Sequence, residues 1–425
     1  MIPERSGEAA AAPGGRPLRI LMVTDRVPGH DTGYGIRVRN VIDGLRAAGD
    51  LHVVLIDSST HGAELDDHDG YTTHRVRVEN PPAWSKGVRL GRLLPANVRY
   101  HRTVAARAAL LRTIGTDAWD LVWCSRARVH VLTHGVLTGS RVVDLDDLND
   151  RLLRSKISDR REQHGALASW PLNVRDRLDV RLWSRLQHRV ADAADTVVVC
   201  SPRDQAHLGV DNCAVVPNGY PEPSSSPVVR DASAPRRILF VGPMTYEPNR
   251  LAVDWLVKSV LPRVRAALPV ELVVVGEHGG VRTRGASQPG VTFTGHVADV
   301  GPHYAAATIA VTPLHSGGGT RIKVIEALAR AVPLVSTSFG CMGHGLVPGR
   351  DLLVADDPAS FADACVLLLE DEALRAEIAT NGRRFYQDRL TATATIAAVA
   401  SVARATAELS FDGFGRRGVP SGQNG

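Results

Sequence analysis

Short apolar runs alternate with helical patterns along almost the whole 425-residue chain, and this alternation constrains its fold more than any other feature. An apolar run of roughly four to eight residues suits a strand that is buried on both faces. Repeated strand–helix–strand units build parallel sheets with helices on both faces. The sequence therefore predicts an α/β protein made of doubly wound, Rossmann-like parallel sheets.

Each half of the chain supplies enough such units for a sheet of its own. We expect strands near 18–24, 51–57, 120–124, 141–145, 195–200 and 213–216 in the first half, and near 237–242, 270–276, 291–294, 308–312, 333–336 and 352–354 in the second. We expect helices near 34–48, 98–115, 172–193, 249–267, 319–331 and 358–370.

A Pro- and Ser-rich stretch at 217–227 is the clearest domain boundary. We expect a first domain at 18–220, a linker at 221–236 and a second domain at 237–390. A helix near 392–406 is a candidate to pack back on the first domain. Residues 1–17 and 410–425 are rich in small and polar residues and are expected to be disordered. Two doubly wound domains joined in this way would face each other across a ligand-binding cleft.

The strongest functional motif is a glycine run, 317–319, that follows an expected strand and opens a helix. Glycine lets the backbone approach a ligand closely, and the free N–H groups at a helix start attract anions. Thr320 is a plausible N-cap. Arg321 and Lys323 then fall in the first helical turn, where the helix dipole disfavours a cation by roughly 0.3–1 kcal/mol. An anion held between these two cations explains their position, and a diphosphate fits best.

Composition narrows the class of ligand and the compartment. A net charge of +5 suits an anionic small substrate or a membrane surface and is too diffuse to indicate nucleic acid. Five scattered cysteines without a CxxC pair, and histidines without an HxH or HExxH pattern, predict no metal site. With no signal peptide and no apolar run of about 18 residues, we expect a cytoplasmic protein.

Further motifs lie at the ends of the expected strands of the second half. They are Val-Gly-Pro-Met-Thr-Tyr-Glu-Pro-Asn at 241–249, Val-Gly at 275–276, Phe-Thr-Gly-His-Val at 293–297, the loop and helix at 313–328, Pro-Leu-Val-Ser-Thr at 333–337, and Gly340, Gly343 and Gly345. Together they resemble the GT-B glycosyltransferases, specifically the large retaining family four, in its glycine-rich GGGTRxKxxEA subgroup. The first half is similar more loosely, through the turn at 33–37 and Val-Pro-Asn-Gly at 216–219.

The resemblance implies transfer of a sugar from a UDP-, dTDP- or GDP-sugar to a hydroxyl of a small molecule or saccharide, without a metal or other cofactor. It implies that Glu326 binds the ribose hydroxyls and that Arg321 and Lys323 hold the diphosphate. The remaining residues of the implied donor site are Gly33, Arg37, Gly242, His296, Gly317, Gly318, Gly319 and Thr320. A solvent-exposed ion pair between Lys323 and Glu326 is the plain alternative.

Two departures from the family pattern concern the donor sugar. Many members carry a glutamate eight positions before the ribose-binding one, and that position is Gly318 here. Many also carry an arginine and a lysine after the strand that ends near 241, and the segment 244–249 has neither. Both changes leave the identity of the sugar open.

The first domain offers weaker candidates. Asp146 and Asp147 follow the strand at 141–145, and the resemblance implies that they contact the acceptor hydroxyl or the donor sugar. A short acidic loop is the plain alternative. The mixed basic and apolar segment 84–95 is a candidate for peripheral contact with anionic lipid at the inner membrane face, or for shaping the acceptor site, with ordinary surface packing as the alternative.

Two other functions stay open for the same fold. One is a nucleotide-sugar epimerase, and the other is a non-catalytic partner that regulates an active subunit. The oligomeric state is not indicated by any motif.

Overall fold

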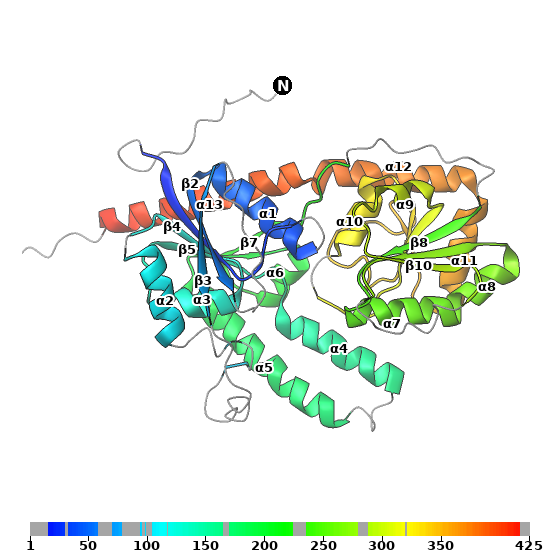
Figure 1. The fold of residues 1–425 in the computed structure, drawn as a ribbon, viewed down its shortest axis with the longest axis horizontal. Coiled ribbons are helices and arrows are strands. Elements are labelled where there is room, and N and C mark those ends of the chain that lie inside the picture. Colours follow the sequence, from blue (N-terminus) through cyan, green and yellow to red (C-terminus); the bar gives the residue numbers. More distant parts are fainter. Residues whose placement is uncertain are drawn as a thin grey trace, which may run out of the picture. The chain divides into compact units, whose positions relative to one another are not determined.

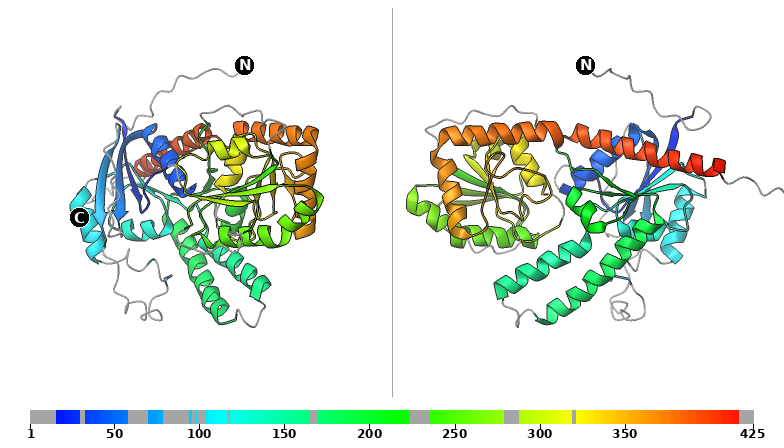
Figure 2. Two further views of the ribbon diagram at one scale, coloured as in Figure 1. Left: turned by 45° about the vertical axis from the view of Figure 1, so that its right-hand side comes forward. Right: turned by 180° about the vertical axis from the view of Figure 1, so that it is seen from behind.

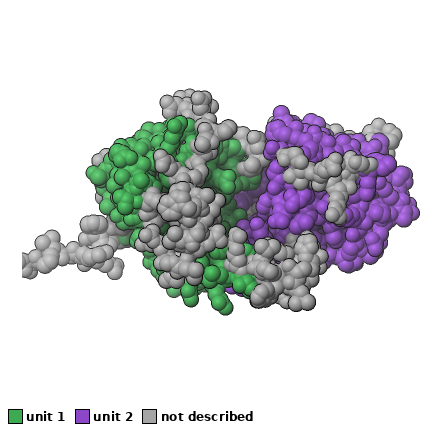
Figure 3. Space-filling model, turned by 60° about the horizontal axis from the view of Figure 1, so that its bottom comes forward, with its two compact units in different colours: residues 1–150, 174–217, 395–425 green, residues 151–173, 218–394 purple. Residues whose placement is uncertain are grey.

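The computed structural model describes residues 16–29, 33–57, 70–78, 94–95, 98, 104–116, 118–164, 170–223, 235–278, 288–318 and 321–416. The chain divides into two compact units: unit 1 comprises residues 1–150, 174–217 and 395–425, and unit 2 comprises residues 151–173 and 218–394 (Figure 3). One division point lies at 217, where the Pro- and Ser-rich stretch begins. Residues 151–173 were expected in the first domain and belong to unit 2 instead, where the Ser155 hydroxyl bonds the backbone of Gly317.

Unit 1 is built on a seven-stranded parallel sheet in the order β3-β2-β1-β4-β5-β6-β7 (Figure 1). The elements up to residue 217 are β1 (Leu18–Thr24), α1 (Gly33–Arg46), β2 (Gly49–Asp57), β3 (Thr72–Arg77), α2 (Val104–Ile114), β4 (Leu121–Cys124), α3 (Ala127–Thr133), β5 (Ser140–Asp144), α4 (Asn149–His164), α5 (Trp170–Ala193), β6 (Thr196–Val199), α6 (Pro202–Leu208) and β7 (Cys213–Val215). All six strands expected here are confirmed. Strand β3 and helices α3 and α6 were not expected, and the described part of the helix predicted at 98–115 is α2.

Unit 2 is built on a six-stranded parallel sheet in the order β10-β9-β8-β11-β12-β13 (Figures 1 and 2). Its elements and the last helix are β8 (Arg237–Val241), α7 (Glu247–Trp255), a π-helical turn (Leu256–Val260), α8 (Leu261–Ala267), β9 (Glu271–Val275), β10 (Val291–Gly295), α9 (Gly301–Ala306), β11 (Ile309–Thr312), α10 (Ile322–Ala329), β12 (Leu334–Ser336), β13 (Leu353–Val354), α11 (Pro358–Glu370), α12 (Glu372–Arg389) and α13 (Ala392–Arg416). The six strands expected in this half are confirmed, and α9 and α12 were missed.

The two faces of the unit 2 sheet carry separate cores because successive side chains of a strand point to opposite faces. Ile238 and Phe240 of β8 pack in one core with side chains of α7, α8 and α11. Leu239, between them, packs in the other core with side chains of α9, α10 and α12. This second core buries Val324, Ile325 and Leu328, which fixes α10 on the sheet.

Helix α13 completes the core of unit 1. Val399, Ala403 and Ala407 pack with the side chains of β1 and α1. A Cβ added at Gly44 of α1 would lie 2.6 Å from the Val399 Cβ, so the two helices approach closely because this position is glycine. The helix continues to Arg416, so residues 410–416 are helical rather than part of the expected disordered tail. Within the described residues, no helix combines the length and apolar character that a membrane crossing requires.

Candidate functional site

The middle of the unit 2 sheet is a topological switch point. Strands β9 and β10 lie on one side of β8, while β11 leads to β12 and β13 on the other. Ligands of open parallel sheets bind at the carboxyl ends of the strands at such a point. The residues that follow β8 and β11 here are Gly242 and the glycine-rich loop before α10.

Lys323, in the first turn of α10, lies at this edge. Its Nζ donates a hydrogen bond to Asn249 Oδ1 at 2.7 Å and lies 4.2 Å from the centre of the Phe240 ring. Burial, together with the nearby charge of Arg321, lowers the pKa of Lys323 to about 7. Among the described residues no carboxylate bonds this ammonium directly, so the alternative of a solvent-exposed ion pair with Glu326 does not describe it.

Gly242 makes room for that lysine. Its φ of 155° is one that side chains rarely adopt, and an added Cβ would lie 2.8 Å from Lys323 Nζ and 2.6 Å from Asn249 Nδ2. The Asn249 amide is itself fixed by donating to the Pro243 carbonyl at 3.0 Å. The glycine, the asparagine and the lysine therefore form one local arrangement, built from the end of β8, α7 and α10.

Glu326 lies one turn further along α10 and is only 7% exposed. Tyr220 donates to its Oε1, and Tyr304 donates to its Oε2 at 3.3 Å. Arg330 Nε lies 4.0 Å from Oε1. Burial raises the pKa of Glu326, whereas the tyrosine hydroxyls and Arg330 oppose this shift. The carboxylate is thus held in one orientation by neutral donors and a distant cation.

Arg321 is the N-cap residue of α10, without a side-chain cap, and the helix begins at Ile322. The prediction that Arg321 falls inside the first turn is wrong by one position, while Lys323 is within it. The Arg321 guanidinium carbon lies 4.3 Å from the centre of the Phe339 ring, and its backbone N–H donates to His344 Nε2 at 3.2 Å. Burial and Arg321 lower the pKa of His344 to about 3, so the imidazole is neutral and able to accept this bond.

The described part of the glycine-rich loop is held by two hydroxyl groups. Ser155 bonds both backbone groups of Gly317, at 3.2 and 3.3 Å, and the Gly318 N–H donates to the Tyr246 hydroxyl at 3.4 Å. Gly317 has a φ of 133°, which explains glycine at this position. Gly319 and Thr320 lie outside the described residues, as does most of the basic and apolar segment at 84–95.

His296 lies at the same carboxyl edge of the parallel sheet, but away from Lys323 and Glu326 in the order of the strands. It follows β10, the outermost strand, which β9 separates from β8, and its side chain is exposed. Gly242, by contrast, lies so near the lysine that an added Cβ would contact its Nζ. A role of His296 in a donor site stays a prediction.

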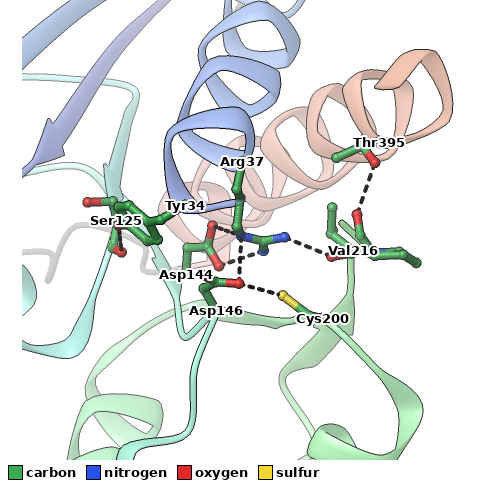
Figure 4. Close-up of polar contacts among 9 residues, drawn as sticks. Tyr34, Arg37, Ser125, Asp144, Asp146, Cys200, Val216 and Thr395 are labelled. Atoms are coloured by element: carbon green, nitrogen blue, oxygen red, sulfur yellow. Dashed lines mark hydrogen bonds and ion pairs between the residues drawn. The ribbon is translucent and has the colours of Figure 1, made fainter. Parts of the chain in front are cut away.

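In unit 1, Arg37 is buried in an ion pair (Figure 4). Its Nη2 and Nε donate to the two carboxylate oxygens of Asp144 at 2.7 and 3.0 Å, and Nη1 donates to the Val216 carbonyl at 3.1 Å. Gly33 begins α1, the helix that carries this arginine. Arg37 is only 2% exposed, and its guanidinium group is paired with Asp144. It therefore links α1 to the end of β5, and we do not assign it to the proposed donor site.

Asp146 lies beside this pair. Its Oδ1 is 3.6 Å from Arg37 Nε and accepts a bond from the Cys200 thiol at 2.9 Å (Figure 4). Asp147 is less buried than Asp146 and acts electrostatically on Arg126. Among the described residues, no group of three or more His, Cys, Asp or Glu side chains could hold a metal ion.

Sequence reasoning missed several residues that surround the predicted ones. Asn249 ends the motif after β8, and its place in that motif could have identified it as a residue of the site. Tyr220, Tyr304 and His344 reach α10 only through the tertiary fold, and no local pattern marks them. Ser155 comes from a polar helix far from the loop in sequence.

Comparisons with known proteins agree with this geometry. Residues 235–371 match the family model described as glycosyl transferases group 1, a segment that includes α10. The chain is 29% identical over 187 residues to a phosphatidyl-myo-inositol mannosyltransferase of Mycobacterium leprae, which covers 41% of this chain and 49% of that protein. It is 24% identical over 197 residues to an uncharacterised 44.6 kDa protein from the cps region of Klebsiella pneumoniae, covering 43% and 51%. The chain thus spans about half the length of the curated relatives it matches.

Solved structures are similar over nearly the whole chain. Sucrose-phosphate synthase from Thermosynechococcus elongatus has a TM-score of 0.66 at 19% identity and covers 93% of this chain and 99% of that one. Anabaena HepE, solved with UDP and glucose, has a TM-score of 0.57 at 15% identity and covers 93% and 100%. These similarities show the fold: two Rossmann-like domains of the GT-B class.

Proposed function

We propose that this chain is a glycosyltransferase that moves a sugar from a nucleotide-diphosphate donor to an acceptor hydroxyl, with retention of the anomeric configuration. The observation that carries the proposal is the placement of Lys323 and Glu326 on one helix at the switch point of unit 2. The match of residues 235–371 to the glycosyl transferases group 1 model supports it. Retention, and membership of family four, rest on the GGGTRxKxxEA motif.

Lys323 and Arg321 are assigned to the diphosphate. Cleavage of the bond between the anomeric carbon and the diphosphate oxygen leaves negative charge on the phosphate, and fixed cations stabilise that charge as it develops. The Lys323 ammonium is held by a neutral amide rather than by a carboxylate, so its charge is not cancelled before a ligand arrives. Diphosphate binding would also favour the protonated form of this lysine.

Glu326 is assigned to the ribose hydroxyls. Each of its oxygens accepts one tyrosine hydroxyl, and a carboxylate oxygen has a second lone pair for a ribose O–H. HepE was solved with UDP and, separately, with UDP-glucose. By analogy we propose a UDP-, dTDP- or GDP-sugar donor and a small-molecule or saccharide acceptor, with Asp146 and Asp147 on the acceptor side. All five cysteines are free thiols, which suits a reducing, cytoplasmic compartment.

The test is nucleotide binding followed by transfer. UDP, dTDP and GDP are titrated calorimetrically into the wild type, Lys323→Ala and Glu326→Ala. Loss of a charge-assisted hydrogen bond should weaken the best nucleotide about 10-fold or more in either variant. Lys258→Ala and Glu377→Ala remove exposed residues of the same types from unit 2 and should bind like the wild type.

Transfer is then followed by mass spectrometry with the matching sugar nucleotide. A product heavier than the acceptor by one sugar residue supports the proposal. A donor of unchanged mass but altered sugar configuration would identify an epimerase. Equal nucleotide affinity in wild type, Lys323→Ala and Glu326→Ala would rule out the site.

A further inference from the structure

A second basic cluster lies in unit 1, at the switch point of its own sheet. Strands β1 and β4 are neighbours, with β2 and β3 on one side and β5 to β7 on the other. The chain continues from β1 into Asp25 and Arg26, and from β4 into Ser125 and Arg126. The backbone N–H of Ser125 donates to the Val23 carbonyl at 3.0 Å, so the two strand ends lie side by side.

Tyr34 of α1 fixes the position of Arg126. The Tyr34 hydroxyl donates to the Ser125 carbonyl at 3.0 Å, and the Arg126 guanidinium carbon lies 3.9 Å from the centre of the Tyr34 ring (Figure 4 shows Tyr34 beside Ser125). Stacking of a guanidinium on an aromatic face restricts its orientation while leaving its N–H groups available. Arg126 is therefore pre-oriented at the end of β4.

The charges around Arg126 fall into paired and unpaired groups. Arg128 pairs with Asp25, and Arg37 pairs with Asp144. Arg26 and Arg126 form hydrogen bonds through their backbones, but in the part of the chain that the structure describes neither guanidinium group has a hydrogen-bond or ion-pair partner. Burial and, after it, the nearby charge of Arg126 lower the pKa of Arg26, whereas Asp25 opposes this shift.

Carboxylates lie near Arg126. Asp146 and Asp147 act electrostatically on Arg126, and they are the residues assigned above to the acceptor side. The ends of β1 and β4 thus offer two cations, Arg26 and Arg126, with unused side-chain N–H donors. Carboxylate oxygens near Arg126 can accept hydrogen bonds from the hydroxyl groups of a ligand. A ligand with both hydroxyl groups and an anionic group matches this combination, because its anion can accept bonds from the unused N–H donors of the two guanidinium groups.

We infer that Arg26 and Arg126 bind an anionic group, phosphate or carboxylate, of a hydroxylated acceptor. This inference rests on the proposed transferase function, because it names the class of acceptor. Two guanidinium groups can form parallel bonds to the oxygens of one phosphate or carboxylate. The acceptor's reacting hydroxyl would then be directed toward Asp146 and Asp147.

The first experiment measures anion binding without catalysis. Inorganic phosphate and acetate are titrated into full-length protein carrying Lys323→Ala, so that the donor-side lysine does not contribute, and binding is followed by NMR or calorimetry. Adding Arg26→Gln or Arg126→Gln should weaken the binding of phosphate or acetate about 10-fold or more. Arg112→Gln, which removes an exposed arginine from α2, should leave it unchanged.

The second experiment measures transfer to matched acceptors: glucose against glucose 6-phosphate and glucuronate, and myo-inositol against its 1-phosphate. The wild type should prefer a phosphorylated or a carboxylated member of a set, which also identifies the anion. The KM for that acceptor should rise about 10-fold in Arg26→Gln and Arg126→Gln, with Arg126→Lys intermediate and nucleotide affinity unchanged.

The outcomes separate the two proposals. Preference for the neutral acceptors, or anion binding that is equal in the Arg26→Gln, Arg126→Gln and Arg112→Gln proteins, overturns the anion site whatever the donor does. Absence of nucleotide binding by the wild type overturns the transferase proposal, and the phosphate titration still reports on Arg26 and Arg126. Since Arg126→Gln also removes the stacking on Tyr34, the exposed Arg26→Gln serves as the variant least dependent on folding.

Discussion

The Tyr220 hydroxyl donates a hydrogen bond to Glu326 Oε1, joining the segment just after residue 217 to the helix of the proposed donor site. The backbone of Tyr220 is fixed on both sides: its N–H donates to the Leu390 carbonyl, and its own carbonyl accepts from the Ala392 N–H, each at 2.9 Å. Tyr386 also donates to that carbonyl, at 3.0 Å. Tyr220 is therefore a rigid support for the Glu326 carboxylate.

Tyr220→Phe should weaken nucleotide binding about 10-fold, because it removes a donor to a buried carboxylate. It should also raise the pKa of Glu326 further, since the lost bond favoured the ionised form. Ribose binding needs the ionised form, so affinity will fall as the pH drops through this raised pKa, and it will fall at a higher pH in the variant. Calorimetric titrations of UDP across pH 5–8 measure both effects.

Tyr386→Phe is the matched control, because it loses a bond to the same backbone segment without touching Glu326. Its pH profile should follow that of the wild type. A ligand lacking both ribose hydroxyls, 2′,3′-dideoxyuridine diphosphate, should bind wild type and Tyr220→Phe alike. A Tyr220→Phe protein with an unshifted profile would contradict the supporting role of Tyr220.

Nucleotide binding should depend on pH through Lys323 as well. Its pKa of about 7 lies below the ordinary value, so near neutral pH part of the free protein carries an uncharged amine. Diphosphate binds the ammonium form, so affinity should fall as the pH rises above about 7, and binding should take up a proton near neutrality. Calorimetry in buffers of different ionisation enthalpy measures this uptake, which Lys323→Ala should largely abolish.

The same lysine should affect the stability of the unliganded protein in the opposite direction. The unfolded chain holds this proton up to about pH 10.5, whereas the folded chain releases it near 7, so the lysine's unfavourable contribution diminishes as the pH rises between these values. Melting temperatures of wild type and Lys323→Met, compared from pH 6 to 9, should differ most at the acid end. A constant difference would show that the lysine titrates normally.

Gly242→Ala should damage the donor site. The added Cβ would contact Lys323 Nζ and the Asn249 amide, and alanine is strained at a φ of 155°. We expect a stability loss of about 1–3 kcal/mol by urea unfolding and a nucleotide affinity at least ~10-fold lower. Gly349→Ala is the control for backbone strain alone, since its φ is 80° and no atom lies within 4 Å of the added Cβ. If both variants lose affinity equally, the contact with Lys323 is irrelevant.

Arg37→Met should destabilise unit 1 by about 3–5 kcal/mol, because it leaves Asp144 buried without its cation. The double variant Arg37→Met/Asp144→Leu should recover much of this loss, since it removes both charges. Arg46→Met breaks an exposed pair with Asp43 and should cost less than about 1 kcal/mol. Urea unfolding followed by circular dichroism compares the three, and a mild effect of Arg37→Met would contradict the buried-pair assignment.

The strands of both sheets could be predicted because burial on two faces leaves continuous apolar runs, as in β8 and β9. Strand β3 was missed because its sequence, Thr-Thr-His-Arg-Val-Arg, is polar and lies at a sheet edge.

In the site, Lys323 and Glu326 were predictable because a glycine run and a helix place them by local spacing alone. Their partners were not, because Tyr220 and Tyr304 meet Glu326 across 106 and 22 residues of sequence. For Arg37, the local sequence pattern does not reveal the residue with which it pairs. Its position after a glycine turn suggested a ligand contact, while the residue it pairs with lies 107 positions away.

The packing of α13 against β1 and α1 has a consequence for how this chain is made. A nascent chain released up to β7 holds every strand of the first sheet but still exposes the apolar surface that Val399, Ala403 and Ala407 will cover. That apolar surface stays uncovered until the ribosome has also translated the whole second sheet and then α13. A fragment ending near residue 217 should therefore aggregate, and adding a peptide of residues 392–416 in trans should rescue its solubility.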